Sequence, residues 1–122
     1  MVYQAVKGEN PIDLDAVFGA LAHGGRRAVL EELARADAPT AMKALAERTR
    51  MSPQLMNKHA ASLERAGLIT RQAHGRETQA VAHPEVLNAA KGWIEEMTEY
   101  WNSQLDALGN YLESLNADGK QD

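Results

Sequence analysis

MSPQLMNKHAASLERAGLI, residues 51–69, followed directly by TRQAHGRETQAVA, residues 70–82, is the stretch that decides the expected fold. Its first part has the signals of one capped helix. Ser52 is a favoured N-cap, Pro53 suits the first helical position, and Gly67 suits the position just past the end. Apolar residues four and three positions apart give this helix a face for burial, formed by Met56, Ala60 and Leu63.

The second part predicts a short basic hairpin. Residues 68–73 and 78–82 are expected to form two strands, and the turn between them is His74-Gly75-Arg76-Glu77. A capped helix that leads directly into a basic β-hairpin is the layout of a winged helix-turn-helix, which inserts one helix into a DNA groove. Sequence-specific DNA binding is therefore the leading hypothesis.

The rest of the chain predicts helices on both sides of this unit. Asn10-Pro11 opens a first helix, and Gly24-Gly25 separates it from a second helix at about residues 26–36. Thr40 is the expected N-cap of a short third helix with Met42, Leu45 and Ala46 buried. The expected fold is mainly α with a small β-hairpin, in the order α-α-α-α-β-β-α. It comprises a flexible arm over 1–9, a winged helix-turn-helix domain over 10–115 with a long C-terminal dimerisation helix over 85–115, and a flexible tail over 116–122.

Charge is distributed unevenly along the chain. The 122 residues have a net charge of −4, but residues 24–76 hold ten Lys or Arg against five acids, whereas residues 77–122 hold two against nine. A basic central segment between acidic ends is typical of a protein whose central segment contacts the phosphates of a nucleic acid. The sequence has no cysteine, no apolar run long enough for a membrane span and no apolar signal-peptide core. We therefore expect one soluble, cytoplasmic domain without disulfides and without a membrane partner.

The exposed side of the capped helix carries side chains that can read bases. Gln and Asn can bond adenine, Lys can bond guanine or phosphate, and Leu can touch a thymine methyl group. The expected base contacts, with a histidine less certain than the others, are Gln54, Leu55, Asn57, Lys58 and His59. Ser52, Thr40 and the start of the second helix are expected at phosphates. Arg71 and Arg76 flank the glycine turn, where an arginine can enter the minor groove. The alternatives to these DNA contacts are that the helix face is simply polar and solvated and that the hairpin has no binding role.

The last helix carries an apolar seam. Ile94, Trp101, Leu108 and Leu115 recur every seven residues, as in a coiled coil. Such a seam either folds back on its own domain or pairs with a second copy, and we expect a homodimer. The predicted interface comprises Leu14, Phe18, Trp93, Ile94, Met97, Trp101, Leu105, Leu108 and Leu112. A two-fold dimer would place two reading helices about 34–36 Å apart, which matches an inverted repeat in double-stranded DNA.

These motifs resemble the ArsR-type winged helix-turn-helix repressors. The resemblance covers most of the chain and rests on LDAVFGALAHGGRRAVLEELA (14–34), on the Lys-His and Leu-Glu-Arg-Ala-Gly-Leu pattern of 51–69, on GRE (75–77) and on WIEEMTEYWNSQLDALGNYL (93–112). The chain departs from the family at Asn57, where serine is usual, at Ala60, where leucine is usual, and at Gly24-Gly25. The resemblance implies a homodimeric repressor of the branch without metal-binding cysteines. It leaves open whether an unidentified small-molecule effector regulates DNA binding.

Metal sensing and catalysis find little support in the sequence. His83 with Glu95 and Glu99 imitates a metal site of the family only poorly, because the spacing is unsuitable and the set holds one histidine. No metal or other cofactor is expected, and no nucleophile or phosphate-loop motif points to an enzyme. Two rival functions remain: a winged-helix protein-interaction or adaptor module without specific DNA binding, and a small enzyme or ligand carrier with a deep polar pocket.

Overall fold

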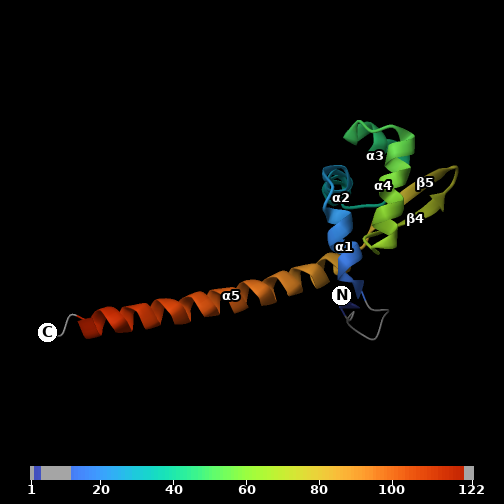
Figure 1. Cartoon of the computed structure of the whole chain (residues 1–122). Coiled ribbons are helices and arrows are strands. Elements are labelled where there is room, and N and C mark those ends of the chain that lie inside the picture. The colour runs from blue at the N-terminus through green and yellow to red at the C-terminus, as the bar shows by residue number, and fades with distance from the viewer. Residues whose placement is uncertain (1, 4–11, 120–122) are drawn as a thin grey trace. The chain divides into compact units, whose positions relative to one another are not determined.

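The computed structural model describes the backbone of residues 2–3 and 12–119 (Figure 1). The chain forms two compact units, residues 1–90 and residues 91–122. The elements of the first unit are β1 (Val2–Tyr3), β2 (Ile12–Asp13), α1 (Leu14–Leu21), α2 (Gly24–Ala36), β3 (Thr40–Ala41), α3 (Met42–Thr49), α4 (Pro53–Arg65), β4 (Ile69–His74) and β5 (Glu77–Ala82). The last helix, α5 (Pro84–Gly119), begins in the first unit and makes up the described part of the second.

Two small antiparallel sheets organise the first unit. One pairs β1 with β2, and the other has the order β3-β5-β4. In the second sheet Arg71 lies opposite Ala80, His74 lies opposite Glu77, and Thr40 pairs with Ala80 from the other side. The predicted hairpin is therefore confirmed. The strand β3 was not predicted, and it makes β5 the central strand.

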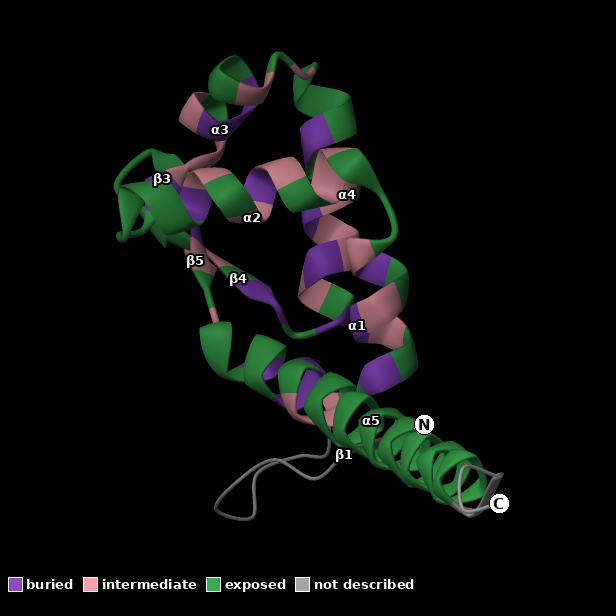
Figure 2. Ribbon diagram, turned by 90° about the vertical axis from the view of Figure 1, so that its left-hand side faces the viewer, coloured by how far each residue is buried: buried purple, intermediate pink, exposed green. Residues whose placement is uncertain are grey.

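The core of the first unit forms where α2 meets the other elements. α2 contacts α1, α3, α4 and β5, and α4 also contacts α1, α3 and β4. Figure 2 shows buried, purple positions recurring along these helices between exposed, green ones. The largest fully buried side chains are Leu14, Val17, Val29, Leu45, Met56, Leu63, Leu68 and Ile69. The predicted inward face of the capped helix is confirmed, since Met56, Ala60 and Leu63 are each at most 1% exposed.

Two predicted helix starts differ from the structure, and a third cannot be compared with it. α1 begins at Leu14, where the carboxylate of Asp13 accepts from the backbone N–H of Ala16 at 3.2 Å; the predicted start at Asn10-Pro11 lies outside the described residues. α2 begins at Gly24, so the break falls before the glycine pair. Thr40 was predicted as the N-cap of the third helix, and this was wrong. The N-cap of α3 is Ala41, because Thr40 is held in the sheet by β5.

The flexible arm predicted over residues 1–9 stays a prediction. Val2–Tyr3 pairs with Ile12–Asp13, and residues 4–11 lie outside the described part of the chain. At the other end, α5 continues to Gly119, past the predicted end at residue 115.

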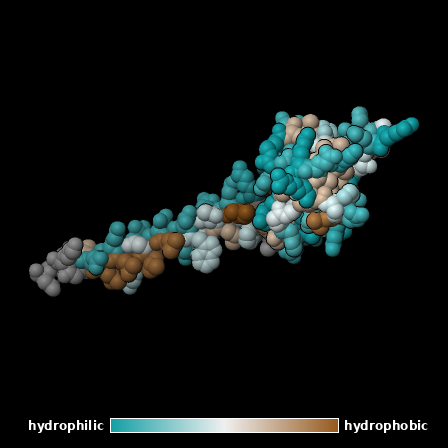
Figure 3. Space-filling view, turned by 90° about the horizontal axis from the view of Figure 1, so that it is seen from above, coloured by the Kyte–Doolittle hydropathy of each residue, from teal (hydrophilic) through white to brown (hydrophobic). Residues whose placement is uncertain are grey.

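The second unit exposes a long apolar stripe on α5. Figure 3 shows hydrophobic, brown residues gathered along one side of this helix. Its exposed large hydrophobic residues are 36–63% accessible: Ile94, Met97, Tyr100, Trp101, Leu105, Leu108, Tyr111, Leu112 and Leu115. The rings of Tyr100 and Trp101 meet edge to face, with centroids 5.6 Å apart. Within residues 12–119 we find no helix with the length and apolarity that a membrane crossing requires.

Candidate nucleic-acid interface

The start of α4 is built as the sequence predicts. Ser52 has an extended backbone and its hydroxyl oxygen accepts a hydrogen bond from the backbone N–H of Leu55 at 3.1 Å, while Pro53 occupies the first helical position. Because the oxygen takes the accepting role, the hydroxyl hydrogen of Ser52 can still be donated. Pro53 has no N–H, and the backbone N–H groups of Leu55 and Met56 both donate to Ser52. In the first turn the N–H of Gln54 is therefore the one left to attract an anion, among the hydrogen bonds of the described residues.

One side of α4 is available to a partner. Gln54, Asn57 and Lys58 are exposed, and Leu55 is 42% exposed although it is apolar. Since the opposite side of the helix is buried in the core, these four side chains are held on a rigid element. Four of the five predicted base contacts are thus brought together on one accessible surface.

His59 lies differently from the other predicted base contacts. Its side chain is half-buried, and a Cβ added to Gly25 at the start of α2 would lie only 2.7 Å from its Nε2 atom. Nδ1 of His59 is buried and has no hydrogen-bond partner in the described part of the chain. Burial, and secondarily the nearby charge of Arg26, lowers the pKa of His59 below its ordinary value of 6.5. The imidazole therefore packs between α4 and α2, in surroundings that favour its neutral form.

The hairpin of β4 and β5, here called the wing, has a sharp tip. Gly75 has φ +64°, whereas Arg76 does not adopt a positive φ. Positive φ at the first of two loop residues is the pattern of a type II′ turn, which favours glycine there. Arg76 is exposed at this tip, as predicted, and its charge is available to a partner.

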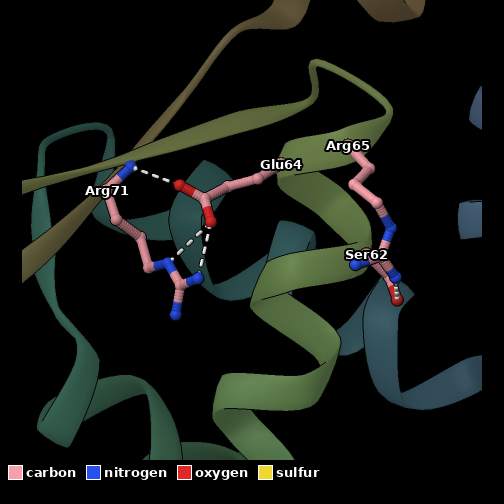
Figure 4. A network of polar contacts seen from close by, with 4 residues as sticks. All are labelled: Ser62, Glu64, Arg65 and Arg71. Carbon is pink, nitrogen blue, oxygen red and sulfur yellow. Dashed lines mark hydrogen bonds and ion pairs between the residues drawn. The ribbon is translucent and has the colours of Figure 1, made fainter.

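Arg71, the second predicted wing arginine, is tied to α4 instead. Its Nε and Nη2 atoms donate to Oε1 of Glu64 at 2.9 and 2.6 Å, and its backbone N–H donates to Oε2 at 3.2 Å (Figure 4). Arg71 and its hydrogen bonds lower the pKa of the Glu64 carboxyl below its usual value. Arg71 lies at the base of the wing and joins it to the helix, which does not suit the predicted insertion into the minor groove.

An open depression lies between α3, α4 and the wing. It has a volume of about 420 Å³ and is lined by Ala41, Met42, Lys43, Asn57, Arg71, Arg76, Glu77 and Thr78. Three cationic side chains meet one acid there, which favours an anionic ligand. Lys43 was missed in the sequence, because only the fold places the first turn of α3 opposite the wing. Its exposed position within a short apolar pattern was the one available signal.

Thr40 does not present its hydroxyl to this surface. The residue is 7% exposed, and its Oγ1 atom donates to the carbonyl oxygen of Ala38 at 3.0 Å. The predicted phosphate contact is therefore at odds with the position of the side chain.

The predicted dimer residues fall into two groups. Leu14 is 1% exposed within the first unit, so it has almost no surface left to bury against another chain. Phe18 and Trp93 are half-buried. The other predicted interface residues are all exposed members of the apolar stripe on α5.

Histidines and carboxylates do not gather into a set of three or more anywhere in the described residues. His83, which the sequence places in a poorly spaced set with Glu95 and Glu99, has other partners. Its Nε2 atom lies 2.9 Å from the hydroxyl of Thr70, and its Nδ1 atom lies 3.3 Å from Oε1 of Glu85.

Comparisons with known proteins agree with this geometry. A model of the MarR family matches residues 24–77, which run from α2 to the first residue of β5. No curated protein matches the sequence. The crystal structure of an ArsR family transcriptional regulator is 34% identical, with a TM-score of 0.66, and the match covers 74% of this chain and 91% of that one.

Two further solved structures extend the comparison. An ArsR-like transcriptional regulator from Rhodococcus sp. RHA1 is 33% identical, with a TM-score of 0.68, over 78% of this chain and 88% of that one. A homodimeric winged helix-turn-helix DNA-binding domain from Mycobacterium bovis is 21% identical, with a TM-score of 0.57, over 75% and 82%, and supports the fold alone. From its identity to the first two structures over most of its length, the chain belongs to the ArsR family of winged helix-turn-helix transcriptional regulators.

Proposed function

We propose that this protein is a homodimeric repressor that binds an inverted-repeat operator in double-stranded DNA. The observation that carries the proposal is the surface of α4. This helix buries Met56, Ala60 and Leu63 and exposes Gln54, Asn57 and Lys58 beside the cationic wing. An α-helix of this kind fits the major groove, and its amide and ammonium groups match the hydrogen-bonding edges of bases.

The surroundings of α4 supply contacts to the DNA backbone. Lys43, Arg71 and Arg76 line the depression beside Asn57, and Ser52 begins the helix with a hydroxyl that can donate. Backbone contacts of this type set the register in which a helix meets base edges, and they make binding depend on salt. Arg76, alone at the exposed wing tip, is the residue that we propose for the minor groove.

The apolar stripe of α5 supports the homodimer. Nine large hydrophobic side chains between residues 94 and 115 are exposed in the single chain, which is more than solvated helices of soluble proteins usually show. A second copy that pairs through this stripe would cover it and would give a two-fold arrangement of two α4 helices. The M. bovis domain with the same fold is itself homodimeric.

Regulation by an effector remains part of the proposal. The sequence has no cysteine, so we place it in the branch of the family without metal-binding cysteines, and the effector would be an unidentified small molecule. Binding of the effector would shift the helical dimer contact and change the spacing of the two α4 helices. A cytoplasmic protein without enzymatic activity is consistent with this role.

Charge reversal tests the proposal. Lys58→Glu combined with Arg76→Glu should abolish operator binding, because two cations at the DNA surface become anions. A matched control, Arg35→Glu at the end of α2, removes an arginine outside this surface and should leave most of the affinity. Binding is measured by fluorescence anisotropy on DNA from upstream of the gene. Undiminished binding by the double variant would refute the proposal, and folded protein without DNA binding in the wild type would favour the adaptor function.

A further inference from the structure

Glu64 uses both of its carboxylate oxygens on one residue of the wing. Oε1 accepts from Nε and Nη2 of the Arg71 guanidinium, and Oε2 accepts from the Arg71 backbone N–H (Figure 4). The side chain and the main chain of Arg71 are therefore fixed to α4 together. The two residues are 32% and 26% exposed, and an ion pair that water reaches to this extent stabilises a fold only weakly.

The clamp leaves part of the guanidinium available. An arginine carries five N–H donors in a planar fork. Nη1 of Arg71 has no hydrogen-bond partner among the described residues, and Arg71 lines the depression that also holds Asn57 and Arg76. An arginine whose other two side-chain nitrogens are held in place presents these remaining donors in a defined direction, at little further cost in side-chain entropy.

We propose that Glu64 is a positioning residue, which holds Arg71 in the depression so that its free donors bind a DNA phosphate while Asn57 reads a base. The proposal rests on the proposed function and deepens it. Glu64 itself does not touch DNA. It couples the wing to α4, because the same carboxylate holds the first strand of the wing to the helix that reads the bases.

The direction in which Glu64→Gln changes the DNA affinity separates a positioning role from an effect of charge alone. Glu64→Gln removes a negative charge beside the DNA surface, so an effect of charge alone would tighten binding. If Glu64 positions Arg71, the same substitution should weaken binding by about tenfold, the scale of one hydrogen bond to a charged group. Glu32→Gln is the matched control, since Glu32 accepts from Arg35 at 2.7 Å in an ion pair on α2, outside the depression.

The dependence of affinity on salt is a readout that a merely structural role would not change. Arg71→Ala should make the plot of log K, the DNA association constant, against log salt less steep by about 0.9, because one phosphate contact is lost. Glu64→Gln should shift the slope toward that of Arg71→Ala, and Glu32→Gln should keep the slope of the wild type. Arg71→Lys retains the charge but lacks the planar fork, so it should also bind more weakly, and it carries the test if Glu64→Gln does not fold.

The DNA affinity of each variant is measured by fluorescence anisotropy with operator DNA at salt concentrations from about 50 to about 300 mM. Folding is checked by circular dichroism at the same temperature. Weaker binding and a lower slope for Glu64→Gln support the inference. Binding equal to or tighter than the wild type, with an unchanged slope, overturns it and leaves Glu64 as a link between helix and wing. If the wild type itself shows no specific binding, the proposed function fails first, and the positioning role with it.

Discussion

Replacing Gly25 with alanine tests how α2 and α4 are fitted together. The new Cβ would lie 2.7 Å from Nε2 of His59 and 3.2 Å from both Cδ2 of His59 and Cε of Met51. Real Cβ atoms essentially never lie within 3.0 Å of such a neighbour, so the first contact, to a nitrogen, is too short by about 0.3 Å or more. Overpacking of this degree costs about 1–3 kcal/mol.

Gly24→Ala is the matched control, because it is the same substitution one position earlier. Its Cβ would have its nearest neighbour at 3.7 Å, Nη2 of Arg27, which is an ordinary contact. Alanine in place of glycine stabilises a helix by up to about 1 kcal/mol, and both variants receive some of this gain. The difference between the two variants therefore isolates the steric cost.

Thermal unfolding followed by circular dichroism measures that difference. We expect Gly25→Ala to melt on the order of 10 °C below Gly24→Ala, since 1 kcal/mol shifts Tm by about 4–8 °C in a domain of this size. Gly25→Ala should also weaken DNA binding, because His59 lies on α4. Equal melting temperatures for the two variants would show that α2 and α4 do not approach as closely as the structure has them.

Three further predictions concern stability and assembly. Burial and the charge of Arg26 lower the pKa of His59, so as the pH falls the unfolded chain takes up a proton before the folded one. Stability should therefore be full above about pH 6.5 and fall as the pH drops through the folded pKa. In His59→Gln the melting temperature should depend less on pH between about pH 5 and 8, and an unchanged pH dependence would refute this. Trp101→Glu with Leu105→Glu should convert the proposed dimer to a monomer in analytical ultracentrifugation while the first unit stays folded. A dimer that persists in this variant would show that α5 does not form the interface. Arg50 has φ +58° between α3 and α4, so Arg50→Gly should raise the free energy of unfolding by about 1 kcal/mol, and a lower melting temperature would contradict this.

The helix α4 was predictable because its signals are local. Ser52, Pro53 and Gly67 mark its ends within the sequence itself, and the buried spacing of Met56, Ala60 and Leu63 requires only helical periodicity. The structure accordingly confirms this helix, the hairpin after it and the exposure of most of the predicted base contacts.

Features that depend on distant pairing could not be predicted. Thr40 looks like an N-cap, yet pairing with Ala80 draws it into the sheet and buries it. Arg71 looks like a free cation of the wing, yet Glu64, seven residues earlier on another element, holds it to α4. Leu14 is apolar at the expected helical spacing, but periodicity does not say whether a core or a second chain covers it.

The most direct test of the account is binding of the purified protein to the DNA upstream of its own gene, in a salt series with unrelated DNA as competitor. A DNA-reading surface made of α4 and the wing predicts tight binding that survives the competitor and falls steeply as salt rises. Footprinting should then reveal two half-sites about one helical turn apart. Equal and weak binding to both DNAs would contradict specific operator recognition and would favour a winged-helix adaptor.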